Sequence, residues 1–173
     1  MSWEEKGPRL WGRGNNGCNG IPCVYRISIV NDDSVPIVVY IGKQTDSDRL
    51  KNFVQSYLAL RDLIRIEENG QVQKSGSWEE AIYGFFKGKE NEPHKIGETD
   101  YGDKFEATTA FCRDLKQIVK LWEYCKNNNK DFKNLRFKFE IMKCSSKEEA
   151  EQKEKYELEQ FKLDGKKPPC NTQ

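Results

Sequence analysis

Tyrosine, lysine and the carboxylic acids are the residues with which this chain could perform acid–base chemistry, because His94 is its only histidine. Mechanisms built on paired histidines, or on a cluster of histidines around a metal ion, are therefore excluded. The remaining candidates gather in two segments. One is Tyr40-Ile41-Gly42-Lys43, at the end of a predicted strand, and the other is a highly charged predicted helix near residue 154.

The first segment brings together side chains that could form one site. Tyr25 and Tyr40 belong to two consecutive predicted strands, and Lys43 follows Gly42 directly. Arg49 comes seven residues after Gly42, at the start of the next predicted helix. Each feature also has an ordinary explanation, since tyrosines favour strands and a glycine at a strand end usually marks a turn. Their convergence with a carboxylate over one end of a sheet is the functional alternative.

The predicted C-terminal helix carries two carboxylates on the side that should be buried. Ala150, Leu158 and Phe161 share one side of this helix, and Glu154 and Glu157 fall on the same side. A buried carboxylate is unfavourable unless it is paired or coordinates a metal ion. The other interpretation is a short, solvated helix that is charged all round. Helical geometry does not choose between Glu154 and Glu157.

The elements that must position these residues follow from hydrophobic periodicity. Strands are predicted at 24–30, 37–41 and 135–141, where β-branched and aromatic residues alternate with polar ones. Helices are predicted from about residue 46 to 64, at 78–87, at 106–126, and from Ser146 to just before Gly165. Ser77 with Glu80, and Ser146 with Glu149, have the spacing of capping boxes. This order predicts a small α/β (α+β) domain with helices flanking a mainly antiparallel, three-stranded central sheet.

A chain of 173 residues is expected to form a single domain, here 1–173. Residues 1–21 are rich in glycine and are predicted to be an irregular arm, with Trp3 and Trp11 docking on the domain or on a partner. Residues 67–105 are rich in Gly, Glu, Lys and Asn and are interpreted as an insertion.

The composition excludes some classes of protein. No run of about 20 apolar residues is present, and the first residues lack the pattern of a signal peptide, so we expect a cytoplasmic protein with no membrane partner. The 29 basic and 28 acidic residues give a net charge of +1. This balance argues against a protein that binds nucleic acid through bulk positive charge. We expect the six cysteines to be free thiols; zinc bound by Cys18 and Cys23 is the less favoured alternative.

Together, these residues resemble those of the GIY-YIG nucleases. The resemblance covers most of the chain in order, with 1–21 and 67–105 as additions, and compact type II restriction endonucleases of this family have a similar length. The segments that carry it are Val24-Tyr25, Tyr40-Ile41-Gly42-Lys43, Arg49, the helix with Glu154, Leu158 and Phe161, and Pro168-Pro169-Cys170-Asn171-Thr172-Gln173.

The resemblance implies a metal site at Glu154. In the family, the metal-binding glutamate precedes one apolar residue by four positions and another by seven, which favours Glu154 over Glu157. Glu154 would be the single protein ligand of Mg²⁺ or Mn²⁺, since Mg²⁺ keeps several waters and binds few carboxylates. The metal ion would neutralise charge on the leaving 3′ oxygen.

The resemblance also implies roles around the scissile phosphate. Tyr25 would activate or orient the attacking water, and Arg49 would stabilise the negative charge of the transition state. Tyr40 and Lys43 would position the phosphate, and Asn171 would anchor the site from the C-terminal segment.

Two positions depart from the family pattern. Cys23 stands where the first motif usually has glycine, and Phe53 stands where a tyrosine or histidine often follows the arginine by one helical turn. Tyr57 or Lys51 could substitute for the latter.

The leading hypothesis is a Mg²⁺-dependent endonuclease that acts on double-stranded DNA, most simply a type II restriction enzyme. We expect the insertion 67–105 to read the DNA, with Trp78, Lys87 and Lys89 among the contacts, and we expect a homodimer or transient oligomer on DNA. Local clusters such as Arg61 with Arg65 could supply positive charge. The alternatives are a catalytically inactive DNA- or protein-binding module with this fold, and a phage or repair nuclease specific for DNA structure.

Overall fold

The computed structural model describes residues 2–6, 20–31, 35–44, 53, 56–57, 60–61, 64, 94–98, 104–107, 115–163 and 167–171. The chain divides into two compact units. The first comprises Met1–Lys51 and Leu135–Gln173, and the second comprises Asn52–Asn134, which includes the predicted insertion. Each unit is described by itself.

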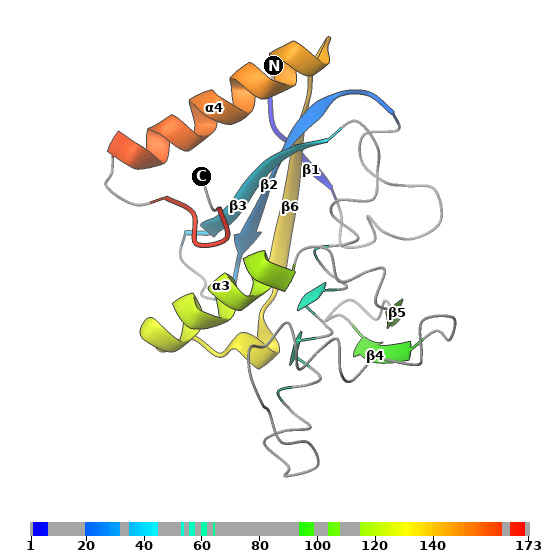
Figure 1. Ribbon diagram of the computed structural model, residues 1–173, viewed down its shortest axis with the longest axis vertical. Helices are drawn as coiled ribbons and strands as arrows, with labels where there is room; N and C mark the ends of the chain where they lie inside the picture. The colour runs from blue at the N-terminus through cyan, green and yellow to red at the C-terminus, as the bar shows by residue number, and fades with distance from the viewer. Residues whose placement is uncertain are drawn as a thin grey trace. The chain divides into compact units, whose positions relative to one another are not determined.

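The first unit is built on an antiparallel sheet of four strands in the order β1-β6-β2-β3 (Figure 1). The strands are β1 (Glu4–Lys6), β2 (Cys23–Ile29), β3 (Ile37–Gln44) and β6 (Phe137–Lys143). The predicted hairpin is confirmed, because β2 pairs antiparallel with β3. The predicted face of β2 is confirmed as well, since Tyr25, Ile27 and Ile29 lie on one side and are buried, although Val24 and Ser28 on the other side are buried too.

The fourth strand corrects the prediction of a three-stranded sheet, and it corrects the prediction of an irregular arm at residues 4–6. Glu4 pairs with Ile141 and Lys6 with Phe139, so β1 supplies hydrogen bonds to a backbone edge of β6 that would otherwise be open. Trp3 packs against the core of this unit, with the guanidinium carbon of Arg26 4.2 Å from its ring centroid. Trp3 therefore docks on its own domain, whereas Trp11 lies outside the described residues.

Helix α4 (Lys147–Leu163) covers one face of the sheet (Figure 1). Its apolar side chains Ala150 and Leu158 form a buried cluster with Val24 and Ile41. The predicted cap is confirmed, because Ser146 Oγ accepts a hydrogen bond of 3.1 Å from the backbone N–H of Glu149.

A charged pair lies on the same face as α4. Arg26 of β2 donates two hydrogen bonds to the carboxylate of Glu140 on β6, with lengths of 2.8 and 3.0 Å. These bonds hold the pKa of Glu140 below its ordinary value, and they outweigh the opposing effect of burial. The paired residues 26 and 140 stand opposite each other in the register, so the pair also links β2 to β6.

The second unit contains helical residues near position 60, helix α3 (Leu115–Asn127), the short 3-10 helix η2 (Phe132–Asn134) and a hairpin of β4 (His94–Glu98) and β5 (Lys104–Ala107). The predicted stripe of the first helix is confirmed at its described positions, where Phe53, Tyr57 and Ile64 are helical and buried.

The second unit differs from the prediction at the start of its long helix. Residues 106–107 were predicted to begin a long helix but belong to strand β5, and α3 begins at Leu115. The alternation in Lys104-Phe105-Glu106-Ala107 fits a strand as well as it fits a first helical turn. The predicted helix at 78–87 lies outside the described residues. In the part of the chain that the structure describes, no helix is long and apolar enough to cross a membrane.

Candidate functional site at the edge of the sheet

The end of the β2–β3 hairpin is organised around Tyr25 and Gly42, which stand opposite each other in the register. A Cβ atom at position 42 would lie 2.9 Å from Cε1 of Tyr25, and closer still to its Cζ and hydroxyl oxygen. The Tyr25 phenol therefore occupies the space that any other side chain at position 42 would need. The sequence predicted that the strand ends at this glycine. That prediction is wrong, because β3 continues to Gln44.

The two phenols of the predicted site lie together. Tyr40 pairs with Ile27, so it is the diagonal neighbour of Tyr25 on the same face of the sheet. The ring centroids are 5.7 Å apart and the planes are inclined by 66°, an edge-to-face contact. Tyr25 is only 2% exposed, whereas Tyr40 is half-buried.

The C-terminal segment adds hydrogen bonds along the outer side of β3. Asn171 Oδ1 accepts a bond of 2.9 Å from the Ile41 N–H, and Asn171 Nδ2 donates a bond of 2.8 Å to the Ile41 carbonyl oxygen. The N–H of Cys170 donates to the carbonyl oxygen of Val39 at 2.9 Å. The buried amide of Asn171 thus holds the C-terminal loop beside the strand, between the positions of Tyr40 and Gly42 (Figure 1).

Helix α4 resolves the choice between its two candidate carboxylates. Glu154 is buried, with 8% of its surface exposed, and Glu157 is half-buried. Glu154 lies one helical turn from Ala150 and one from Leu158, both of which contact the sheet. The structure therefore singles out Glu154 as the buried carboxylate on the surface of α4 that faces the sheet.

The predicted site residues approach β3 from both faces of the sheet. Val24 and Ile41 point toward α4, so their neighbours Tyr25 and Tyr40 point to the opposite face. Strand β3 is the last strand of the sheet order. A site that uses the phenols and Glu154 together must therefore form around the edge of β3.

Lys43 points to the α4 face and contacts that helix. Its Nζ lies 3.1 Å from Oε1 of Glu151, with 42% and 52% of the two side chains exposed. The hydrogen bond from Lys43 is the main cause that lowers the pKa of Glu151. Glu151 was not predicted, because nothing in its spacing separates it from the other charged residues of α4.

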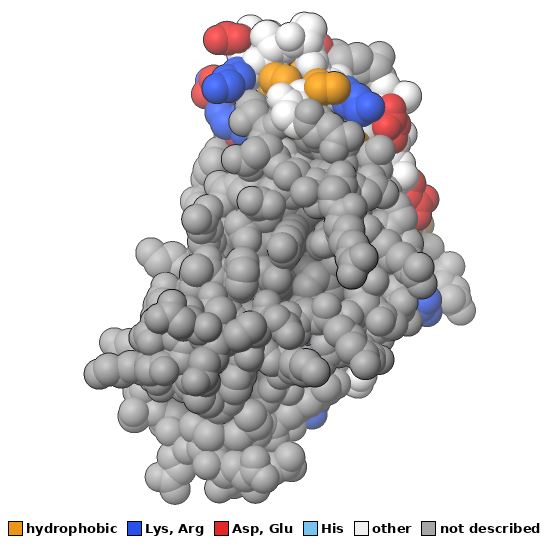
Figure 2. Space-filling view, turned by 90° about the vertical axis from the view of Figure 1, so that its right-hand side faces the viewer, with side chains coloured by type: hydrophobic (Ala, Val, Ile, Leu, Met, Phe, Trp, Pro, Cys, Tyr) orange, Lys and Arg blue, Asp and Glu red, His pale blue; other side chains and the backbone are white. Residues whose placement is uncertain are grey.

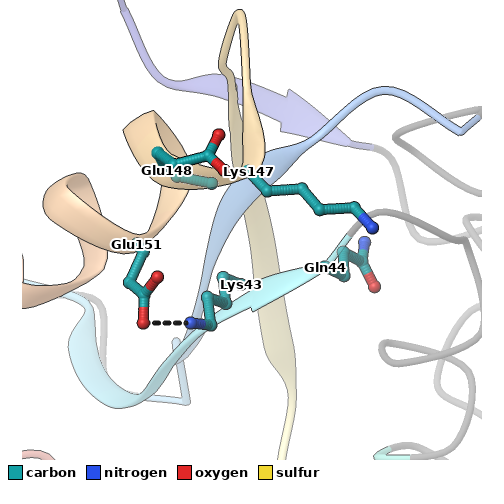
Figure 3. Close-up of a pocket in the computed structure, with 6 residues that line it drawn as sticks. Lys43, Gln44, Lys147, Glu148 and Glu151 are labelled. Carbon is teal, nitrogen blue, oxygen red and sulfur yellow. Dashed lines mark ion pairs between the residues drawn. The ribbon is translucent and has the colours of Figure 1, made fainter.

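A cavity of about 430 Å³ opens beside this ion pair. It lies between the end of β3 and the first turns of α4 (Figure 3). Its described lining residues are Lys43, Gln44, Lys147, Glu148, Ala150 and Glu151.

Several predicted positions are not placed, and others have structural roles. Arg49, Trp78, Lys87 and Lys89 lie outside the described residues. The hydroxyl of Tyr57 donates a hydrogen bond of 2.7 Å to the carbonyl oxygen of Phe132, within the second unit. Arg61 is 7% exposed and its guanidinium carbon lies 5.9 Å from the Tyr57 ring centroid, so Arg61 is not a solvated DNA-binding side chain as proposed.

The cysteines correct one expectation. Cys125, Cys144 and Cys170 are free, as predicted, and they are buried, but Cys23 is disulfide-bonded. Burial raises the pKa of the Cys125 thiol to about 11, so it is not a reactive thiolate at neutral pH. Cys23 in a disulfide has no thiolate for zinc. Within the described ranges, no three His, Cys, Asp or Glu residues are grouped so that they could hold a metal ion.

The described surface carries charges of both signs. On the face shown in Figure 2, basic and acidic side chains lie beside hydrophobic ones at the upper end, and the grey area belongs to residues that are not described. No family model, curated protein or solved structure matches this chain.

Proposed function

We propose that this protein is a Mg²⁺-dependent DNA endonuclease whose site lies around the edge of β3. The observation that carries the proposal is the packing of Tyr25 against Gly42. The Tyr-Ile-Gly segment and the tyrosine of the preceding strand depend on each other physically, because only glycine leaves room for the phenol. Tyr40 lies edge-on to the same phenol. Asn171 is hydrogen-bonded to Ile41, the residue between Tyr40 and Gly42.

In this proposal the residues of the first unit have different roles at the scissile phosphate. Tyr25 orients the attacking water through its hydroxyl group. Tyr40 and Lys43 position the phosphate, and Arg49 stabilises the charge that develops in the transition state. Asn171 keeps the strand segment in place through its two hydrogen bonds to Ile41.

Glu154 fits the metal ion that this chemistry needs. Its carboxylate offers hard oxygen ligands, and Mg²⁺ commonly binds one or two carboxylates while it keeps several waters. Since the described residues contain no larger group of ligands, a metal ion at Glu154 would take its other ligands from water and the DNA. When bound, Mg²⁺ supplies charge neutralisation at the leaving oxygen.

A restriction enzyme is the specific form of the proposal. The insertion 67–105, which belongs to the second unit, is the proposed source of sequence specificity, with Trp78, Lys87 and Lys89 as DNA contacts. A homodimer is the proposed form that cuts both strands. Exchanging the insertion for another sequence should change the preferred cleavage sites. Identical cleavage sites after the exchange would refute this assignment.

The test of the proposal is nicking of supercoiled plasmid with and without Mg²⁺, by the wild type and by Glu154→Gln. Glu157→Gln is the matched control, because it makes the same change three residues away on α4. We expect Mg²⁺-dependent nicking by the wild type and the control, and at least a hundredfold loss in Glu154→Gln, which is of the size expected when a principal electrostatic group is removed. Equal nicking by wild type and Glu154→Gln would refute the assignment.

The second candidate function is a DNA- or protein-binding module without catalysis. Two observations favour it: Cys23 is disulfide-bonded at the position of the family's glycine, and the Tyr57 hydroxyl is engaged with Phe132. The same plasmid assay distinguishes the two functions, since the module would bind DNA without nicking it at any Mg²⁺ concentration.

A further inference from the structure

The cavity between β3 and α4 has the chemistry of a site for a phosphate group. Two ammonium groups reach it from different elements, Lys43 from β3 and Lys147 from the first turn of α4. Figure 3 shows Lys147 extending toward Gln44, which is 6% exposed. At about 430 Å³, the cavity has room for a phosphate group and its waters.

The two lysines differ in their surroundings. Lys43 is paired with Glu151 at 3.1 Å, and about half of the Glu151 side chain is exposed. Within the described residues, no carboxylate lies within ion-pair distance of Lys147. The Glu151 carboxylate thus stands where an anionic ligand of Lys43 would stand, while Lys147 has its ammonium group available.

Charge in the cavity sets the condition for binding. Among the described lining residues, the four charged ones, Lys43, Lys147, Glu148 and Glu151, have a net charge of zero. An anion therefore gains from entering only if a carboxylate leaves. Glu151 can leave easily, because an exposed ion pair contributes little and its carboxylate is solvated when it turns away from Lys43.

We propose that this cavity binds a phosphate group of the DNA backbone next to the bond that is cut, and that Glu151 occupies Lys43 until DNA displaces it. This inference rests on the proposed function for the identity of the ligand. Lys147 makes the first contact with the phosphate. Lys43 then exchanges the Glu151 carboxylate for a phosphate oxygen of the same DNA strand. Glu151 is a positioning residue, since it acts on DNA through Lys43.

The test is binding of a fluorescent DNA duplex in EDTA, measured by anisotropy at low salt. Glu151→Gln should bind the duplex roughly 2- to 5-fold more tightly than the wild type, the range that an exposed ion pair supports. The matched control is Glu159→Gln, which removes the same charge from an exposed position of α4 that does not line the cavity. The control should change the affinity by clearly less. Lys147→Met should weaken binding and reduce its dependence on salt.

A double variant ties the effect to Lys43. Glu151→Gln should have no further effect in a Lys43→Met background, because no ammonium remains to be released. Equal tightening by Glu151→Gln and Glu159→Gln would overturn the proposal, since it would show a general charge effect. Tightening that persists without Lys43, or no duplex binding by any variant, would also overturn it.

A second arm separates the DNA backbone from free phosphate. The side-chain amide signal of Gln44 in a ¹⁵N NMR spectrum should shift with duplex DNA at concentrations where inorganic phosphate leaves it unchanged. An equal shift with inorganic phosphate would overturn the assignment to DNA. Failure of this inference is distinguishable from failure of the proposed function. If the protein cuts DNA but Glu151→Gln does not change DNA binding, only the assignment of the cavity is refuted. If the binding tests give the expected results but the protein does not cut DNA, only the nuclease assignment is refuted.

Discussion

Replacing Gly42 by alanine tests whether the Tyr25 phenol and this glycine form one unit. The new Cβ would lie 2.9 Å from Cε1 of Tyr25 and closer to two further atoms of the ring system, so the phenol or the strand must move. Overpacking of this kind costs about 1–3 kcal/mol. Alanine regains about 0.5–1 kcal/mol, because glycine is unfavourable in a strand. We therefore expect Gly42→Ala to lower the free energy of unfolding by about 1–2 kcal/mol.

The same substitution should behave differently once the ring is absent. In a Tyr25→Ala background nothing occupies the space over position 42, so Gly42→Ala should be neutral or stabilise by about 0.5–1 kcal/mol. The assay is urea unfolding followed by tryptophan fluorescence, arranged as a double-mutant cycle. A coupling energy of about 2 kcal/mol between the two sites is expected from these figures. An equal loss of stability in both backgrounds would refute the argument that the glycine exists to admit the phenol.

Three further perturbations test the first unit. Glu140→Gln should lower the unfolding free energy by about 1–3 kcal/mol at pH 7, since it weakens charged hydrogen bonds. Arg26 lowers the pKa of Glu140, so the pair stabilises the wild type above the ordinary pKa of 4.5, and this stability is lost as the pH falls below that value. Below pH 4.5, the unfolding free energy of the variant in urea should therefore depend less on pH than that of the wild type. Asn171→Ala should cost about 1–3 kcal/mol and speed hydrogen exchange at the Ile41 amide; unchanged exchange would contradict the observed bond. Ser146→Ala should cost about 1 kcal/mol in the same unfolding assay, and no loss would mean that the cap is unimportant.

The hairpin and the last helix were predictable because local pattern and tertiary structure agree there. Tyr25, Ile27 and Ile29 recur at every second position, which predicted the strand, and all three are buried in β2. Ser146 and Glu149 gave the start of α4 to within one residue. In both cases, the signal lies within a few neighbouring residues.

Strand β1 could not be predicted, because its stability depends on a distant partner. Glu4-Glu5-Lys6 has no apolar alternation, and it becomes a strand by pairing with β6, more than a hundred residues later. The hairpin of β4 and β5 was missed for a related reason. Its segments are short, and four alternating residues are compatible with either a strand or a helix end.

The arrangement of the candidate residues depends on packing that the sequence pattern does not contain. Helical periodicity left Glu154 and Glu157 equivalent, and only packing against the sheet separates them. The disulfide at Cys23 and the pairing of Lys43 with Glu151 depend on side chains that come together in the fold.

The most direct test of the central claim is sequencing of the DNA ends that the purified protein produces from a mixture of genomic and phage DNA with Mg²⁺. We predict discrete ends, produced by the wild type and by Glu157→Gln but not by Glu154→Gln or by the wild type in EDTA. Such a result would assign cleavage to this site and would also report the symmetry of the recognised sequence. The same ends from Glu154→Gln, or no ends from any protein, would contradict the account.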